Sequence, residues 1–152
     1  MSLGGGGGGG AMQQIQEQMQ ALEQEKQAIQ AEIQNIREEQ GEIDEAIEAI
    51  ETLESGSTVQ VPIGGDAYVR AEIQDMDEVV VTLGGGYAAE RNSDGAIESL
   101  ERKKETLDDR IAELEAEIET VEEETEDLEA KAQQAQQQQM QQMQQMQQQD
   151  DE

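Results

Sequence analysis

The chain has 152 residues and is strongly acidic: 37 Asp and Glu residues stand against 9 Lys and Arg residues, which gives a net charge of -28. This charge repels nucleic acids and anionic membrane surfaces, so we expect neither as a partner. Without Phe, Trp, Cys or His, the chain lacks the material of a conventional core, the cysteine thiolate, the usual general base and the common zinc ligands. We therefore expect no enzyme, no cofactor and no metal site.

The acidic residues run through the whole chain instead of forming one block. This favours salt adaptation, in which carboxylates stay hydrated in a salt-rich cytoplasm; the alternative is an ordinary solvated helix face. The start of the chain lacks a secretory signal pattern, and no run reaches the roughly 20 apolar residues of a membrane span. The sequence therefore predicts a cytoplasmic protein without a membrane segment.

Residues 1–11 are glycine-rich, and we interpret them as a flexible linker or a mobile extension. They are not expected to continue a helix, because each glycine costs about 1 kcal/mol of helix propensity. From residue 12 to 54, apolar residues recur in steps of three and four, which is the heptad pattern of a coiled-coil helix. These residues are Met12, Ile15, Met19, Leu22, Ile29, Ile33, Ile36, Ile43, Ile47 and Ile50.

Residues 55–92 change to a period of two, which predicts four short strands in two β-hairpins. Their alternating residues are Val59, Val61 and Ile63, then Val69, Ala71 and Ile73, then Val79, Val81 and Leu83. The glycine-rich stretches 64–66 and 84–86 are interpreted as hairpin turns, since neither opens a helix as a phosphate-binding loop would. The acidic turn 75–78 lacks the spacing of a calcium loop.

Residues 93–135 repeat the heptad pattern and predict a second coiled-coil helix, for which residues 92–94 are candidate caps. Its heptad positions are Ile97, Leu100, Lys104, Leu107, Ile111, Leu114, Ile118, Val121, Thr125, Leu128, Ala132 and Ala135. If the helices fold back on each other, pairing Ile50 with Ile97 places Met12 opposite Ala135. The row of apolar heptad residues along each helix is called its seam. The two seams are nearly equal in length, which favours this hairpin over a parallel dimer of separate helices. Lys26, Gln40, Lys104 and Thr125 interrupt the seams, and polar residues at such positions set the register.

Residues 136–152 form a Gln-rich tail in which Met140, Met143 and Met146 are spaced by three. On a helix these methionines would share one sector. In the register above, however, the tail has no partner, so we expect it to be helical at best intermittently. A disordered tail and a stripe of adaptable apolar side chains are equally consistent with this pattern.

The predicted fold is therefore α+β: a long antiparallel α-helical coiled-coil hairpin with two small β-hairpins inserted between its helices. Two hairpins on a thin pair of helices have open strand edges and an apolar face with nothing beneath it. The insert therefore predicts oligomerisation through its strands.

The insert STVQVPIGGDAYVRAEIQDMDEVVVTLGGGYAAERN, flanked by two heptad helices, resembles the archaeal prefoldin alpha subunit over roughly residues 15–132. The resemblance rests on the Val-Pro-Ile-Gly-Gly turn, the Tyr-Val and Val-Val-Val strands and the Gly-Gly-Gly-Tyr turn, which stand in order. Four strands are similar to the alpha class, because beta subunits have a single hairpin. The acidity fits a salt-adapted, halophilic member.

This resemblance implies an ATP-independent chaperone, a holdase, in a hetero-hexamer of two alpha and four beta prefoldin subunits. The strands of all subunits would form a β-barrel platform, and the helix tips would bind unfolded polypeptides for delivery to a group II chaperonin. The strand residues would be Val59, Val61, Ile63, Tyr68, Val69, Val79, Val81 and Leu83. The tip residues would be Met12, Ile15, Met19, Leu128 and Ala135, with Met140, Met143 and Met146 as a further candidate stripe. The alternative is a coiled-coil tether or scaffold that oligomerises through its hairpins and binds no client.

Overall fold

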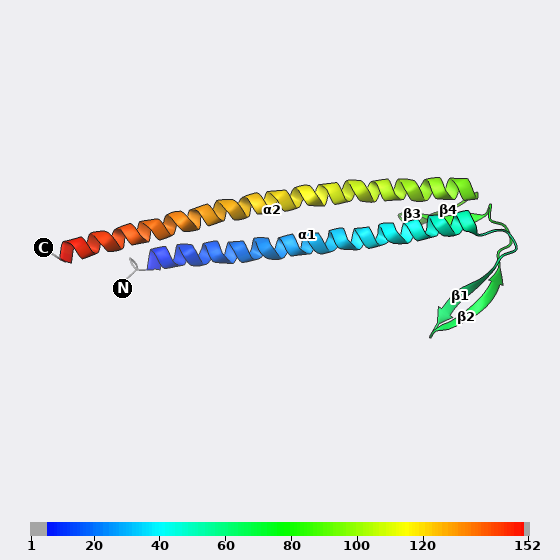
Figure 1. Ribbon diagram of the computed structural model, residues 1–152, viewed down its shortest axis with the longest axis horizontal. Helices are drawn as coiled ribbons and strands as arrows, with labels where there is room; N and C mark the ends of the chain where they lie inside the picture. Colours follow the sequence, from blue (N-terminus) through cyan, green and yellow to red (C-terminus); the bar gives the residue numbers. More distant parts are fainter. Residues whose placement is uncertain (1–5, 151–152) are drawn as a thin grey trace. The chain divides into compact units, whose positions relative to one another are not determined.

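The computed structural model describes residues 6–150, which form two helices with two β-hairpins between them (Figure 1). The elements are α1 (Gly6–Thr52), β1 (Thr58–Gly64), β2 (Ala67–Glu72), β3 (Val79–Gly84), β4 (Tyr87–Arg91) and α2 (Ser93–Asp150). No helix within this range is long and apolar enough to cross a membrane. The chain divides into two compact units: α1 up to Ile33 with α2 from Ala112 onward, and the segment Gln34–Ile111.

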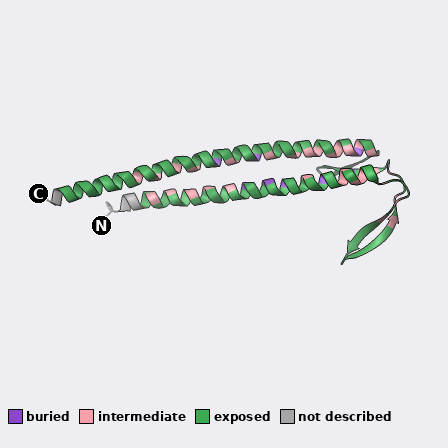
Figure 2. Cartoon of the chain, viewed as in Figure 1, coloured by how far each residue is buried: buried purple, intermediate pink, exposed green. Residues whose placement is uncertain are grey.

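In each unit α1 and α2 lie side by side (Figure 2). The side chains that are buried from solvent lie mainly at the predicted heptad positions. Buried side chains recur at heptad spacing in both helices, and Leu114 is only 1% exposed. The buried apolar residues of the helices are Ile29, Ile33, Ile36, Ile43, Ala96, Leu114 and Val121. Apart from Ala96, all are predicted seam positions, so the two seams of one chain pack on each other and the hairpin of helices is confirmed.

Both helices are longer than the sequence pattern predicts. α1 begins at Gly6, so the prediction that the glycines cannot continue the helix is wrong for Gly6 to Gly10; extending an existing helix needs no new nucleus. The earlier glycines lie outside the described residues. α2 continues to Asp150, which corrects the prediction of an intermittently helical tail, because Gln and Met are good helix formers.

The two β-hairpins repeat one motif. Each is antiparallel, and each has a register shift just before its turn, at Ile63 in the first hairpin and at Leu83 in the second. The turns use backbone with positive φ, which Asp66 adopts at 61° and Gly86 at 82°; this geometry suits the right-handed twist of a two-residue hairpin. Each β-hairpin forms its own two-stranded sheet, so the insert is not one four-stranded sheet.

Side-chain hydrogen bonds join the hairpins to the helix ends. Asn92 caps α2, because its Oδ1 accepts the backbone N–H of Gly95 at 2.8 Å. The segment between the β-hairpins is held from both sides: the Met76 N–H donates to Ser55 Oγ at 3.0 Å, and the Ser93 hydroxyl donates to the Met76 carbonyl at 2.6 Å. The predicted cap at residues 92–94 is confirmed, with Asn92 as the capping residue.

Candidate functional site

The β1–β2 hairpin presents an open apolar face. Val61 and Val69 lie directly opposite each other in the register, and both are exposed, at 41% and 47%. Ile63, the residue at the bulge, is 64% exposed. Tyr68 pairs with Pro62, so its ring lies on the other face, because successive strand residues point to opposite sides. Paired apolar residues left in water on a two-stranded sheet indicate a surface that a partner covers.

The β3–β4 hairpin differs, because its matching face is covered by its own unit. Val81 occupies the place that Val61 has in the first hairpin, yet Val81 is only 6% exposed. Side chains of this hairpin and of α2 line one groove, so the hairpin lies against α2. The prediction that both hairpins have nothing beneath their apolar face is therefore wrong for the second hairpin. Its outer face remains open at Val80, which is exposed.

The predicted methionine stripe lies on the exposed C-terminal part of α2. Every described side chain after Ala135, up to residue 148, is exposed. Met140, Met143 and Met146 are 64%, 66% and 70% exposed. Since all three sit on a continuous helix, they form one stripe in a sector of α2. The structure thus contains a solvent-exposed row of flexible, polarizable side chains.

The other predicted tip residues face the seam. They are Met12, Ile15, Met19, Leu128 and Ala135, and all five are half-buried. The structure therefore separates the predicted tip set into a half-buried group between the helices and an exposed group on α2. Their role in binding stays a prediction.

A groove of about 400 Å³ opens between the helices in the unit that contains these residues. Leu22 of α1 and Leu128 of α2 provide its apolar surface, and Glu25 and Glu124 lie at its polar side. Sequence reasoning assigned Leu22 to the seam and did not recognise the groove, because its two walls come from segments far apart in the sequence. The only available signal was that the predicted register places Leu22 and Leu128 within one helical turn of each other across the two helices.

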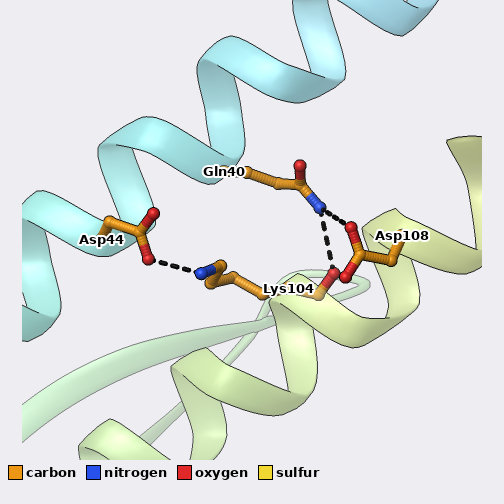
Figure 3. Close-up of polar contacts among 4 residues, drawn as sticks. All are labelled: Gln40, Asp44, Lys104 and Asp108. Atoms are coloured by element: carbon orange, nitrogen blue, oxygen red, sulfur yellow. Dashed lines mark hydrogen bonds and ion pairs between the residues drawn. The ribbon is translucent and has the colours of Figure 1, made fainter.

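Polar residues at the seam fix how the helices pair in the Gln34–Ile111 unit (Figure 3). The Gln40 amide donates to Asp108 Oδ1 at 2.6 Å and to the Lys104 carbonyl at 3.2 Å. The Lys104 ammonium lies 2.5 Å from Asp44 Oδ1. This hydrogen-bonded ion pair raises the pKa of Lys104, because a nearby carboxylate favours the charged form. Shifting one helix along the other would break these contacts, so they specify the register.

A cross-helix ion pair of the same kind lies in the unit formed by α1 up to Ile33 and α2 from Ala112. Lys26 Nζ lies 3.1 Å from Glu122 Oε1, and Thr125 satisfies its hydroxyl on its own helix by donating to the Val121 carbonyl at 2.8 Å. Among the described residues, no buried side-chain nitrogen or oxygen lacks a hydrogen-bond partner. Lys26, Gln40 and Lys104 thus make cross-helix contacts that set the register, as the sequence predicts, whereas the contact of Thr125 stays within its own helix.

The geometry defines a class of protein: a coiled-coil hairpin that displays apolar surface on a strand insert and along an exposed helix. The sequence matches the family described as prefoldin subunit over residues 22–149. The chain belongs to the prefoldin family. This is a family of chaperones, whose subunits assemble with other prefoldin subunits, including beta.

The relatives point to the alpha class in halophilic archaea. The prefoldin subunit alpha of Haloarcula marismortui is 69% identical over 113 residues, which cover 74% of this chain and 73% of the relative. That of Halobacterium salinarum is 63% identical over 114 residues, which cover 75% and 73%. Among solved structures, a filamentous PFD from Methanocaldococcus jannaschii is similar with a TM-score of 0.54 and 28% identity, covering 81% of this chain and 98% of that one.

Proposed function

We propose that this chain is the alpha-type subunit of a cytoplasmic holdase, which binds unfolded polypeptides without ATP and without catalysis. In this proposal two copies assemble with four beta subunits, and the complex delivers its clients to a group II chaperonin. The observation that carries the proposal is apolar surface exposed in two separate places, on the hairpins and along the end of α2. One place serves assembly and the other serves clients. The family membership supports this function over a tether that binds no client.

The β1–β2 hairpin is the proposed assembly surface. Its exposed Val61 and Val69 form a cross-strand pair, and strand edges next to such a pair accept another strand by backbone hydrogen bonding. The β3–β4 hairpin already uses its matching face, at Val81, inside its own unit. We therefore assign its contribution to assembly to the outer face and the strand edges.

The methionine stripe and the half-buried tip residues are the proposed client surface. Unfolded chains present many different apolar segments, and methionine adapts to them because its side chain is unbranched and polarizable. Each contact is weak, but several copies of the subunit in one complex add their contacts by avidity. The exposure of Met140, Met143 and Met146 means that these side chains are available without any rearrangement of the helix.

The test compares two triple variants of these methionines in the assembled complex. Replacing all three by Gln removes the apolar surface and keeps a good helix former, whereas replacing them by Leu keeps both. We expect the Gln variant to suppress aggregation of a denatured model protein several-fold less well, and the Leu variant to retain most of the activity. Full activity of the Gln variant would contradict client binding by the stripe and would favour the tether.

A further inference from the structure

A second groove, of about 420 Å³, lies between the β3–β4 hairpin and α2, and it is basic in an otherwise acidic chain. Arg91 extends from β4, and Arg102 and Lys103 extend from α2. These are three of the nine basic residues in a chain whose net charge is -28. Leu83 and Leu107 add apolar surface to the same groove. The negative charge of the chain is enough to keep it soluble, so solubility does not explain why three basic residues lie together in this groove.

The basic side chains are only partly neutralised by the chain itself. Arg102 Nη2 lies 2.7 Å from Glu98 Oε1, one helical turn earlier, and both side chains remain exposed. Within residues 6–150 the structure gives no ion pair for Arg91 or Lys103. Two cations of the groove thus have no carboxylate of their own, although carboxylates are abundant in the sequence.

Arg91 lies beside Gly95 in the first turn of α2. A Cβ atom placed on Gly95 would lie 3.5 Å from Arg91 Cβ and 3.6 Å from Arg91 Cδ. The aliphatic part of Arg91 therefore lies against the first turn of α2, where only hydrogen occupies the space of a side chain. This packing holds Arg91 near the helix that supplies the other two cations.

We propose that this groove binds a short acidic peptide segment of a partner protein, whose carboxylates pair with Arg91, Arg102 and Lys103. The α2 wall runs from Ser99 to Leu107, about 12 Å at 1.5 Å per residue, which is the length of about three to four residues of extended chain. Leu83 and Leu107 offer contact to one aliphatic side chain. The occupant is thus an extended segment in which acidic residues flank an aliphatic one.

Charge also decides between a peptide and a nucleic acid. A nucleic acid carries phosphates far beyond the length of the groove, and these would meet the surrounding carboxylates of a chain with 37 acidic residues. A short peptide confines its charge to the groove. Arginine binds a carboxylate through two parallel hydrogen bonds, so the carboxylates of a short peptide fit the two arginines of the groove.

The test measures binding of the peptide acetyl-Glu-Leu-Asp-amide, labelled with a net-neutral rhodamine, to the full chain by fluorescence anisotropy. Salt is set where circular dichroism shows full helicity. We expect saturable binding that is at least tenfold weaker for the uncharged peptide acetyl-Gln-Leu-Asn-amide. The double variant Arg91→Gln, Lys103→Gln should weaken binding of the acidic peptide at least tenfold, whereas Lys131→Gln, which removes a charge from the other groove, should change it less than twofold.

Three results would overturn the proposal. They are equal binding of the acidic and the uncharged peptide, unchanged affinity in the double variant, and saturable binding of inorganic phosphate alone with none of the acidic peptide. Circular dichroism of each variant checks that the helices are intact. The inference does not rest on client binding, and the double variant should still suppress aggregation of a denatured protein as well as the unchanged chain.

Discussion

Replacing Gly41 by Ala should stabilise the protein. Gly41 lies inside α1, and a Cβ atom built there meets nothing within 4 Å. An exposed glycine inside a helix costs about 1 kcal/mol relative to alanine, because the unfolded glycine has more backbone freedom to lose. The added methyl group causes no clash that would offset this gain. The expected result is an increase of about 1 kcal/mol in the free energy of unfolding, or roughly 2 to 4 °C in Tm for a chain of this size.

The matched control is the same substitution at Gly95. There a Cβ atom would lie 2.8 Å from Asn92 Oδ1, the atom that accepts the Gly95 N–H and caps α2. Losing a cap costs about 1 kcal/mol, so Gly95→Ala should lower Tm. Thermal unfolding followed by circular dichroism measures the Tm of both variants. Salt and protein concentration are held fixed, because assembly changes the apparent stability. An unchanged or lower Tm for Gly41→Ala would refute the reasoning.

Three other predictions concern the buried Leu114, the ion pair of Lys104 and the exposed Val61. Leu114→Ala, at a side chain 1% exposed, should lower the free energy of unfolding by about 2 to 5 kcal/mol in chemical denaturation; a change below 1 kcal/mol would contradict the seam packing. The raised pKa of Lys104 means that its ion pair with Asp44 stabilises the fold fully below the ordinary lysine pKa and is lost as pH rises through the folded value. The stability gap between the unchanged chain and Asp44→Asn should thus close in strongly alkaline solution, and a gap that widens there would have the wrong sign. Val61→Asp should block assembly with beta subunits while leaving helicity unchanged, and a native mass equal to that of the unchanged complex would argue against assembly through β1–β2.

The helices illustrate what periodicity alone predicts. Apolar residues at heptad spacing can be buried only if another heptad seam packs on them, so Ile29 and Leu114 were predictable core positions and are buried. The glycines at 6 to 10 show the limit of this reasoning. Propensity measures what a glycine costs on average, whereas helix extension also depends on the helix that already exists beside it.

The hairpins mark the division between local and tertiary information. Turn chemistry and alternation predicted both hairpins, because these depend on neighbours along the chain. The sequence by itself thus determined which elements form, their periodicity and the register in which the helices pair, but not the outer ends of the two helices. Only the tertiary structure decided that Val81 is covered while Val61 is open, and that Arg91 meets Lys103 in one groove. The physical reason is that burial and charge depend on which segments meet in space, and two hairpins of the same local pattern can meet different surroundings.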